Sequence, residues 1–161
     1  MSYVIRPSTI ADLSAVDALL ARSYPKLLKA DYAPSVLVLA LPVIAKAQPK
    51  LLACGTYYVA EQDNAVLGAG GWTRDAHDGT LGHIRHVASD DRHLRRGIGR
   101  AIISHCFDRA HLAGVQHMEC WSTLSAESFY KSLGFETVGP MDVTLEGGIT
   151  FPSLRMRKAL A

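Results

Sequence analysis

The sequence predicts a single domain of the mixed α/β (α+β) class, with helices on both faces of a central, mostly antiparallel sheet of about seven strands. Segments of strand and helix character follow one another in the order β-α-α-β-β-β-α-β-α-β-β, which contains one parallel strand–helix–strand unit. The chain has 161 residues, of which 48% are hydrophobic and 20% charged. That length and composition are ordinary for one globular domain with one core. We therefore expect residues 1–161 to form a single domain.

The N-terminal part is expected to hold one strand and two helices. Residues 3–6 have the character of a short strand. A helix follows as far as about Tyr24, because apolar residues recur there at helical spacing after a Ser-Thr pair that can cap the helix. Residues 25–50 contain four prolines around apolar stretches. This composition favours a second, broken helix and irregular chain.

The middle of the chain is expected to form three consecutive strands. Residues 56–62 and 65–73 are rich in β-forming residues, and the Asp63-Asn64 pair between them is typical of a hairpin turn. Residues 81–89 form the next strand, which begins the parallel unit. Alternation along this strand would place His83, Arg85, Val87 and Ser89 on one face and His86 on the other.

The C-terminal part begins with a helix from about Ile98 to Ala113, whose apolar residues fall in one half of the helical wheel. Gly114 is suited to end it. The remaining expected elements are a strand at 115–121, a short helix from Ser125 to Gly134, and two strands at 137–145 and 150–158.

Composition narrows the functional classes. A net charge of +2 provides no global field that would draw the protein to nucleic acid or to an anionic membrane. Three cysteines without paired spacing suit a reducing compartment, and the histidines and cysteines lack the spacing of a metal site. No signal peptide is visible, and the longest apolar run, residues 36–45, is too short for a membrane span. We expect a cytoplasmic protein without a metal, a membrane partner or a nucleic-acid partner.

The segment RHLRRGIGRAI at residues 92–102 places two glycines and four arginines at the start of a helix. A helix N-terminus presents unpaired N–H groups and a partial positive charge, and glycines let an anion approach the backbone closely. A pyrophosphate fits such a site. The segment lacks the Lys-Ser/Thr ending of a nucleotide triphosphatase loop and the third glycine of a dinucleotide fingerprint. A plain turn beside a solvated basic face is the alternative.

Taken with the residues that follow it, this loop resembles the acetyl-CoA loop of the GNAT superfamily of N-acetyltransferases. The family signature Arg/Gln-x-x-Gly-x-Gly/Ala appears as Leu94-Arg95-Arg96-Gly97-Ile98-Gly99. A second signature, Asn-x-x-Ala-x-x-Phe-Tyr followed by Gly-Phe, appears as TLSAESFY at 123–130 and as Gly134-Phe135. The close resemblance covers about residues 81–135 and implies a GNAT-like fold for the whole chain.

The resemblance implies that acetyl-CoA is bound as a co-substrate. The residues that it implies for this role are Val87, Ser89, Leu94, Arg95, Arg96, Gly97, Ile98, Gly99, Arg100 and Thr123. Two of them depart from the family pattern. Leu94 stands at the Arg/Gln position and still supplies a backbone N–H, whereas Thr123 stands at the Asn position and keeps a hydroxyl without the amide. The N–H of Val87 is assigned to the acetyl oxygen, on which negative charge grows during attack.

Two catalytic residues are expected. An alkyl ammonium has a pKa near ~10, so a base with a pKa near ~6.5 suits its deprotonation. His83 lies fourteen residues before Gly97, similar to the position where several GNAT enzymes carry a catalytic Glu or His. We expect His83 to act as the general base, directly or through water. Tyr130 matches the tyrosine that in many family members protonates the departing CoA thiolate.

The expected function is acetyl transfer to a primary amine of a small molecule, by direct attack in a ternary complex. The loops expected to choose the acceptor, residues 22–54 and 73–82, show no clear excess of either charge. Three alternatives stay open: a non-catalytic sensor of acyl-CoA, an acetyltransferase that acts on a protein N-terminus or lysine, and nucleic-acid binding through residues 92–100. The length of the acyl group and the formation of a homodimer also stay open.

Overall fold

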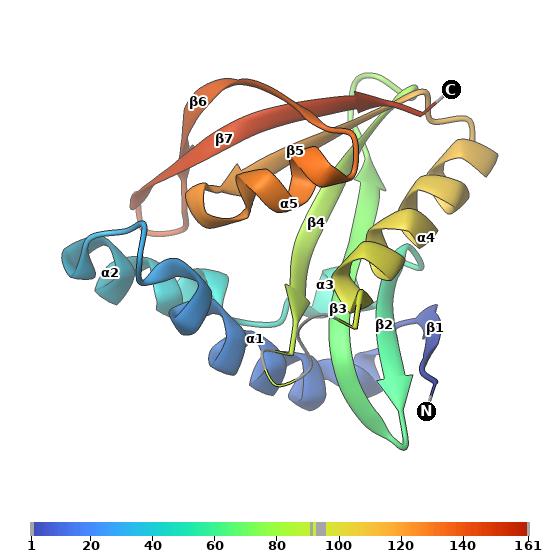
Figure 1. Ribbon diagram of the computed structural model, residues 1–161, viewed down its shortest axis with the longest axis horizontal. Coiled ribbons are helices and arrows are strands. Elements are labelled where there is room, and N and C mark those ends of the chain that lie inside the picture. The colour runs from blue at the N-terminus through green and yellow to red at the C-terminus, as the bar shows by residue number, and fades with distance from the viewer. Residues whose placement is uncertain (1, 91, 93–95, 161) are drawn as a thin grey trace.

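The computed structural model describes residues 2–90, 92 and 96–160, and the expected site residues Leu94 and Arg95 lie outside these ranges. The described residues form one sheet in the order β1-β2-β3-β4-β5-β7-β6 (Figure 1). Its strands are β1 Val4–Pro7, β2 Tyr57–Gln62, β3 Ala65–Arg74, β4 Leu81–Ser89, β5 His117–Thr123, β6 Glu136–Thr144 and β7 Thr150–Ala159. Neighbouring strands run antiparallel except β4 and β5, which run parallel. This confirms the predicted class of sheet and its parallel pair.

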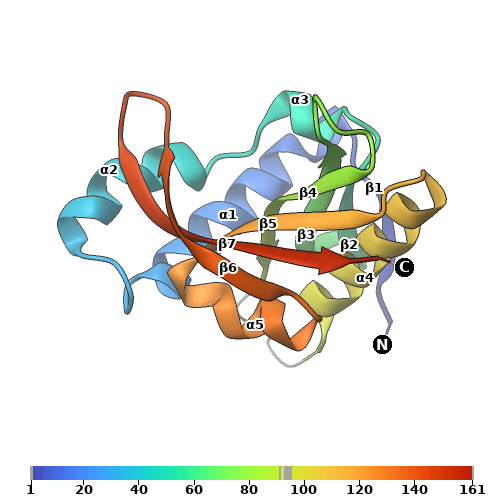
Figure 2. The ribbon, with the colours of Figure 1, turned by 90° about the horizontal axis from the view of Figure 1, so that it is seen from above.

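Helices cover both faces of this sheet, as predicted (Figure 2). Their bounds are α1 Leu13–Leu28, α2 Pro34–Ile44, α3 Pro49–Leu52, α4 Ile98–Leu112 and α5 Glu127–Ser132, with short 3-10 turns at Ile10–Asp12 and Leu124–Ala126. Buried residues of α1, α2 and α3 form one apolar cluster with the sheet, and those of α4 and α5 form a second. The helices within the described ranges all lack the combination of length and apolar character that crossing a membrane requires.

Helix α1 extends beyond its expected end at Tyr24, through Pro25 to Leu28. Tyr24 and Leu28 are 7% and 0% exposed in the cluster beneath α1. Burying a large apolar side chain contributes roughly 1.5–3 kcal/mol, so these two together offset the cost of about 3 kcal/mol for a proline inside a helix. Packing from distant parts of the sequence thus overrides the local stop signal.

Strand β4 contains a bulge at His86, where the backbone φ is +50°. Ala69 pairs with Ala88 and Gly71 pairs with Arg85, so β4 carries one residue more than β3 between these pairs. The extra residue reverses the alternation of side chains beyond it. The expected common face of His83, Arg85, Val87 and Ser89 is therefore wrong after Arg85, because Val87 packs with the α4 cluster while Ala88 packs with the α1 cluster.

Strands β4 and β5 are paired only at their beginnings. Leu81–His83 pair with His117–Glu119, and the two strands then diverge (Figure 1). The remainder of β4 therefore presents an edge toward β5 without a neighbouring strand. Two carbonyl groups of this segment accept hydrogen bonds from tyrosine side chains, His86 O from Tyr57 Oη at 2.6 Å and Val87 O from Tyr24 Oη at 3.0 Å.

Candidate active site

The divergence of β4 and β5 opens a small cavity of about 100 Å³, called here the gap cavity. It is lined by Tyr24, Leu27, Ile84, His86, Val87, Cys120, Trp121, Ser122, Thr123, Ala126 and Tyr130. Two larger pockets share its walls. The α5 pocket, of about 340 Å³, shares with it Tyr24, Leu27, Val87, Ala126 and Tyr130. The large pocket, of about 470 Å³, shares with it Tyr24, Ile84, His86, Trp121 and Thr123. The three spaces therefore lie side by side across the opening between the strands.

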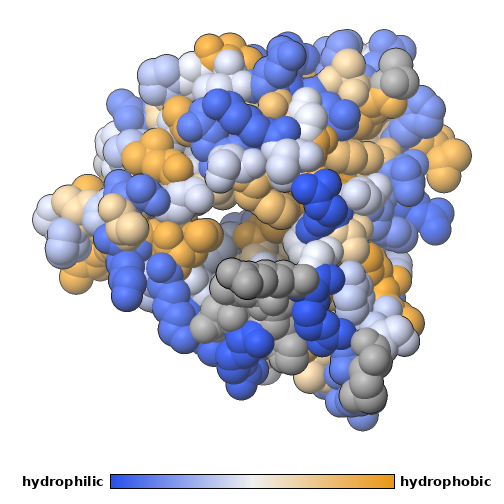
Figure 3. All heavy atoms as spheres, viewed as in Figure 1, coloured by the Kyte–Doolittle hydropathy of each residue, from blue (hydrophilic) through white to orange (hydrophobic). Residues whose placement is uncertain are grey.

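The α5 pocket lies between α1, the end of β4 and α5. Its lining is Ser23, Tyr24, Lys26, Leu27, Val87, Ala88, Ser89, Gly99, Ser125, Ala126, Phe129 and Tyr130. Figure 3 shows the surface hollowed between these elements on the face viewed in Figure 1. Of the residues expected to bind the cofactor, Val87, Ser89 and Gly99 line this pocket. Thr123 lines the gap cavity and the large pocket instead.

The start of α4 has the features expected of an anion-binding helix end. Gly97 caps the helix with φ +70°, a conformation that favours glycine, and among the described residues no side chain caps the first N–H groups. A Cβ built on Gly99 would lie 3.2 Å from Cζ of Phe129, so a side chain there would crowd the α5 pocket. Ile98 is 3% exposed and belongs to the core, so only its backbone is available to a ligand.

Arg96 and Arg100 are held by neighbouring side chains and line none of the three pockets. Arg96 Nη2 donates to Gln62 Oε1 at 2.6 Å, and its guanidinium lies 5.7 Å from the ring centre of Tyr3. Arg100 Nη2 donates to Ser132 Oγ at 2.9 Å. Arg96 directly precedes Gly97 and Arg100 lies in the first turn of α4, so both charges are close to the start of this helix.

A buried carboxylate, Asp90, fixes the chain between β4 and this loop. It accepts hydrogen bonds from Arg22 at 2.8 Å and from the side chain and backbone of Arg92. The Arg92 hydrogen bond is the main reason that the pKa of Asp90 falls to about 2. Sequence reasoning missed this residue, because its partner Arg22 lies 68 positions away on α1.

Two hydroxyl groups in the walls lack partners. Thr123 Oγ1 and Ser125 Oγ are buried, and neither has a hydrogen-bond partner within the described part of the chain. A buried polar atom without a partner costs free energy, so both positions fit a ligand that supplies one. Thr123 was expected from the sequence, whereas Ser125 was not.

His83 lies on β4 between two carboxylates. Its Nε2 is 2.8 Å from Asp75 Oδ1, and its Nδ1 is 3.6 Å from Glu119 Oε2. The hydrogen bond from His83, followed by those from the N–H groups of His77 and Asp78, lowers the pKa of Asp75 to about 2. Burial acts to raise the pKa of Glu119, but hydrogen bonds from Trp121 and Arg155 outweigh it and hold the pKa below its ordinary value. The ring of His83 thus lies between two carboxylates whose pKa values are both held below their ordinary values.

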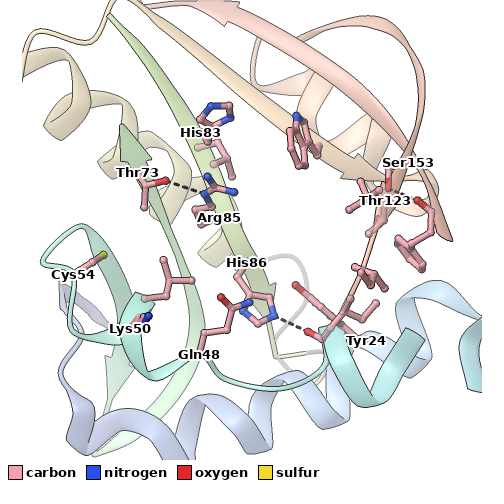
Figure 4. A pocket seen from close by; sticks show the side chains of 17 residues that line it. Tyr24, Gln48, Lys50, Cys54, Thr73, His83, Arg85, His86, Thr123 and Ser153 are labelled. Carbon is pink, nitrogen blue, oxygen red and sulfur yellow. Dashed lines mark hydrogen bonds between the residues drawn. The ribbon is translucent and has the colours of Figure 1, made fainter. Parts of the chain in front are cut away.

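His86 faces the same large pocket as His83, contrary to the expectation from alternation, because of the bulge (Figure 4). Its Nε2 is 2.6 Å from Ile44 O, and a carbonyl only accepts, so Nε2 carries the proton and Nδ1 the lone pair. Burial lowers the pKa of His86, so the ring is neutral near pH 7. No hydrogen bond to Nδ1 occurs among the described residues. His86, which also lines the gap cavity, therefore keeps the lone pair of a proton acceptor on Nδ1.

Tyr130 lines both the gap cavity and the α5 pocket. Its ring packs edge-on against Phe129 and Phe135, with centroids at 5.1 and 5.6 Å. Burial raises the pKa of Tyr130 well above 10, so the phenol keeps its proton through the neutral range. Tyr24, which sequence reasoning missed, lines all three spaces. Tyr24 lies at the expected end of α1, but no local signal in the sequence marks it as a pocket residue.

The fold and these pockets together define the class of protein. A GCN5-related N-acetyltransferase from Rhodopseudomonas palustris is similar over 99% of this chain and 96% of its own, with a TM-score of 0.80 and 18% identity. PaiA N-acetyltransferase from Thermoplasma acidophilum, in complex with coenzyme A, is similar over 99% of each chain, with a TM-score of 0.74 and 14% identity. YncA from Salmonella typhimurium, with its cofactor acetyl-CoA, is similar over 100% of this chain and 95% of its own, with a TM-score of 0.67 and 20% identity. These likenesses show the fold of an N-acetyltransferase.

Sequence comparison carries the assignment to the family. Residues 53–137, more than half of the chain, match the family described as Acetyltransferase (GNAT) domain. The chain therefore belongs to the GNAT acetyltransferase family, which confirms the resemblance seen in its motifs. No curated protein matches the sequence significantly.

Proposed function

We propose that residues 1–161 act as one domain that transfers an acetyl group from acetyl-CoA to a primary amine of a small molecule, by direct attack in a ternary complex. The observation that carries this proposal is the set of three spaces across the divergence of β4 and β5. In this proposal the α5 pocket takes acetyl-CoA, the gap cavity holds the reacting groups and the large pocket takes the acceptor amine. The large pocket, of about 470 Å³, is in the size range of small-molecule sites.

Acetyl-CoA fits the α5 pocket and the loop beside it. The first N–H groups of α4, from Gly97 to Arg100, would hold the pyrophosphate, with charge from Arg96 and from Arg95 outside the described residues. The backbone of Leu94, also outside them, is assigned to the same contact. Val87 and Ser89 would pair with the pantetheine arm along the open edge of β4. The unpartnered hydroxyls of Thr123 and Ser125 add two polar groups for the same ligand.

The chemistry proceeds without a covalent enzyme intermediate. The lone pair of the acceptor nitrogen attacks the carbonyl carbon of the thioester, and the Val87 N–H stabilises the charge that develops on the oxygen. As the new C–N bond completes and the C–S bond breaks, the thiolate takes the proton of the Tyr130 hydroxyl. The nitrogen gives its own proton to a base on β4.

The proposed base is His83, either directly or through water. Asp75 accepts from Nε2, which leaves the lone pair on Nδ1, and Glu119 at 3.6 Å stabilises the ring once it is protonated. His86 is the second candidate, because its neutral ring lines the gap cavity and keeps its lone pair on Nδ1. The pH dependence of kcat/KM separates the two. After correction for the protonated fraction of the acceptor amine, whichever of His83→Gln and His86→Gln removes the remaining acidic limb of the profile carries the base, and the other variant keeps that limb.

The direct test incubates the purified protein with acetyl-CoA and a panel of small amines while free thiol is measured. Thiol release that depends on the amine, with a matching N-acetyl product by mass spectrometry, supports the proposal. Tight binding of acetyl-CoA without release for any amine would make the chain an acyl-CoA sensor. Release only with peptides would make it a protein acetyltransferase. The three free cysteines, Cys54, Cys106 and Cys120, are in keeping with the cytoplasmic location that we propose.

A further inference from the structure

The large pocket combines apolar walls with positive charge. Its apolar side chains are Ile44, Leu51, Ile84, Trp121, Val143, Leu145 and Phe151. Its charged lining consists of Arg85 and Lys50, and the described residues that line it include no Asp or Glu. A pocket of this kind suits a ligand with an apolar body and one negative group.

Arg85 is the centre of this charge. It lies on β4 between the two histidines, and Figure 4 shows its side chain extending into the pocket. Nε donates to Thr73 Oγ1 at 2.8 Å, which fixes the plane of the guanidinium. Within the described ranges, Nη1 and Nη2 make no hydrogen bond, and no carboxylate forms an ion pair with Arg85 within 4.0 Å. Nη1 and Nη2 are thus available to donate a bidentate pair of hydrogen bonds to a ligand.

The nearby carboxylate does not neutralise this charge. Asp75 is already engaged by His83 and by the N–H groups of His77 and Asp78. Burial lowers the pKa of Arg85 from its ordinary value, which records the cost of placing a charge in this partly enclosed position. An anionic ligand that accepts two parallel hydrogen bonds would relieve that cost.

We propose that the acceptor is an amino acid with an apolar side chain, whose carboxylate binds Nη1 and Nη2 of Arg85 while its amine enters the gap cavity. This proposal rests on the proposed function and specifies its substrate class. A carboxylate matches the single guanidinium in charge and in the spacing of its two oxygens. A phosphate would carry a second charge, and the second cation among the described lining residues, Lys50, is exposed.

The first test compares matched acceptors in the thiol-release assay. Leucine and phenylalanine are each compared with their amides and with the amines that lack the carboxyl group, 3-methylbutylamine and 2-phenylethylamine. A hydrogen-bonded charge pair predicts a kcat/KM about 10- to 150-fold higher for the amino acid. The amide is the sharper control, because an α-amino group beside a neutral carbonyl has a pKa near ~7.7–8.0 and so is about half unprotonated or more at pH 8. A preference for the acid over the amide therefore cannot come from the supply of free amine.

The second test assigns that preference to Arg85. Arg85→Met should reduce the ratio of kcat/KM between leucine and its amide to within about twofold, mainly through KM for leucine. Arg85→Lys keeps the positive charge but not the planar guanidinium that donates two parallel hydrogen bonds, so it should retain only part of the preference for leucine over its amide. Lys50→Met, which removes the other cation of the pocket, should leave the ratio within about twofold of that of the unmodified protein. An equal loss in Lys50→Met and Arg85→Met would show a general field instead of a specific contact and would overturn the proposal.

Binding of products separates this proposal from the proposed function. N-acetyl-leucine and N-acetyl-leucinamide are titrated into the protein by calorimetry, with and without CoA. Tighter binding of the acid, lost in Arg85→Met, supports the carboxylate site even if no acceptor releases thiol. Equal binding of both compounds, or acetylation of the plain amines as fast as of the amino acids, refutes the carboxylate site and leaves the amine acetyltransferase intact. Preference for an aminophosphonate over the matching amino acid would also refute it.

Discussion

Replacing Tyr130 by Phe removes a hydroxyl and leaves the ring packing in place. The ring contacts with Phe129 and Phe135 are retained, and only the atom proposed to protonate the thiolate is lost. General acid catalysis contributes 10²- to 10⁴-fold, and the phenol lies in a wall where Tyr130 is 7% exposed, so water is a poor substitute. We therefore expect kcat to fall about 100-fold or more, which corresponds to about 2.7 kcal/mol or more in the barrier. The free energy of unfolding should change by less than about 1.5 kcal/mol, the usual worth of one hydrogen bond.

The assay follows thiol release at saturating acetyl-CoA from pH 6 to pH 9. The raised pKa of Tyr130 keeps the phenol protonated over this range, so the loss in Tyr130→Phe should be nearly constant with pH. Tyr58→Phe is the matched control, since Tyr58 is buried in the same cluster and lines none of the three spaces. A kcat within threefold of the unmodified protein at every pH would show that another group, or water, protonates the thiolate.

Three further outcomes are expected. Asp90→Asn should lower the free energy of unfolding by about 2 kcal/mol at pH 7 in denaturant titrations. Because the pKa of Asp90 is depressed to about 2, the unmodified protein should lose this contribution as the pH falls from about 4 to 2, and the variant should lack that part of the acid dependence. Thr123→Val should raise the Kd for acetyl-CoA several-fold in calorimetry without lowering stability, because its hydroxyl has no partner within the described ranges; an unchanged Kd would remove that contact. Gly99→Ala should weaken acetyl-CoA binding through its contact with Phe129 yet leave or raise the melting temperature, and weakening of both together would point to a misfolded loop.

The strands and the long helices could be predicted because their signals are local. Alternation and turn residues predict strands at 65–73 and 81–89, and the structure has them at Ala65–Arg74 and Leu81–Ser89. The apolar stripe of the helix and Gly114, which is suited to end it, predict a helix from about Ile98 to Ala113, and the structure has α4 at Ile98–Leu112. The end of α1 could not be predicted, because burial of Leu28 against distant strands decides it.

The candidate site was predictable only in part, for the same reason. His83 and Tyr130 carry motif signals, and both line the predicted region. The bulge at His86 has no signature in its own strand, since the hydroxyl groups that hold its backbone come from Tyr57 and Tyr24, 29 and 63 positions away along the chain. Because of this bulge, His86 lines the large pocket and Val87 packs toward α4. The contact of His83 with Asp75 is more local, because Asp75 follows the end of β3 in the β3–β4 hairpin and lies eight positions before His83.

The unpaired edge of β4 also bears on how the protein avoids aggregation. Open strand edges invite the addition of strands from other chains, and proteins commonly blunt them with charges, prolines or bulges. Here the exposed edge sits at the back of a recess between α1 and α5, behind the hollow of Figure 3, and its middle carries the bulge at His86. A slender extended molecule can reach it, whereas the sheet of a second protein is kept away by the flanking helices. The main-chain hydrogen-bonding groups of this edge are thus accessible to a small extended ligand but not to a strand of another protein.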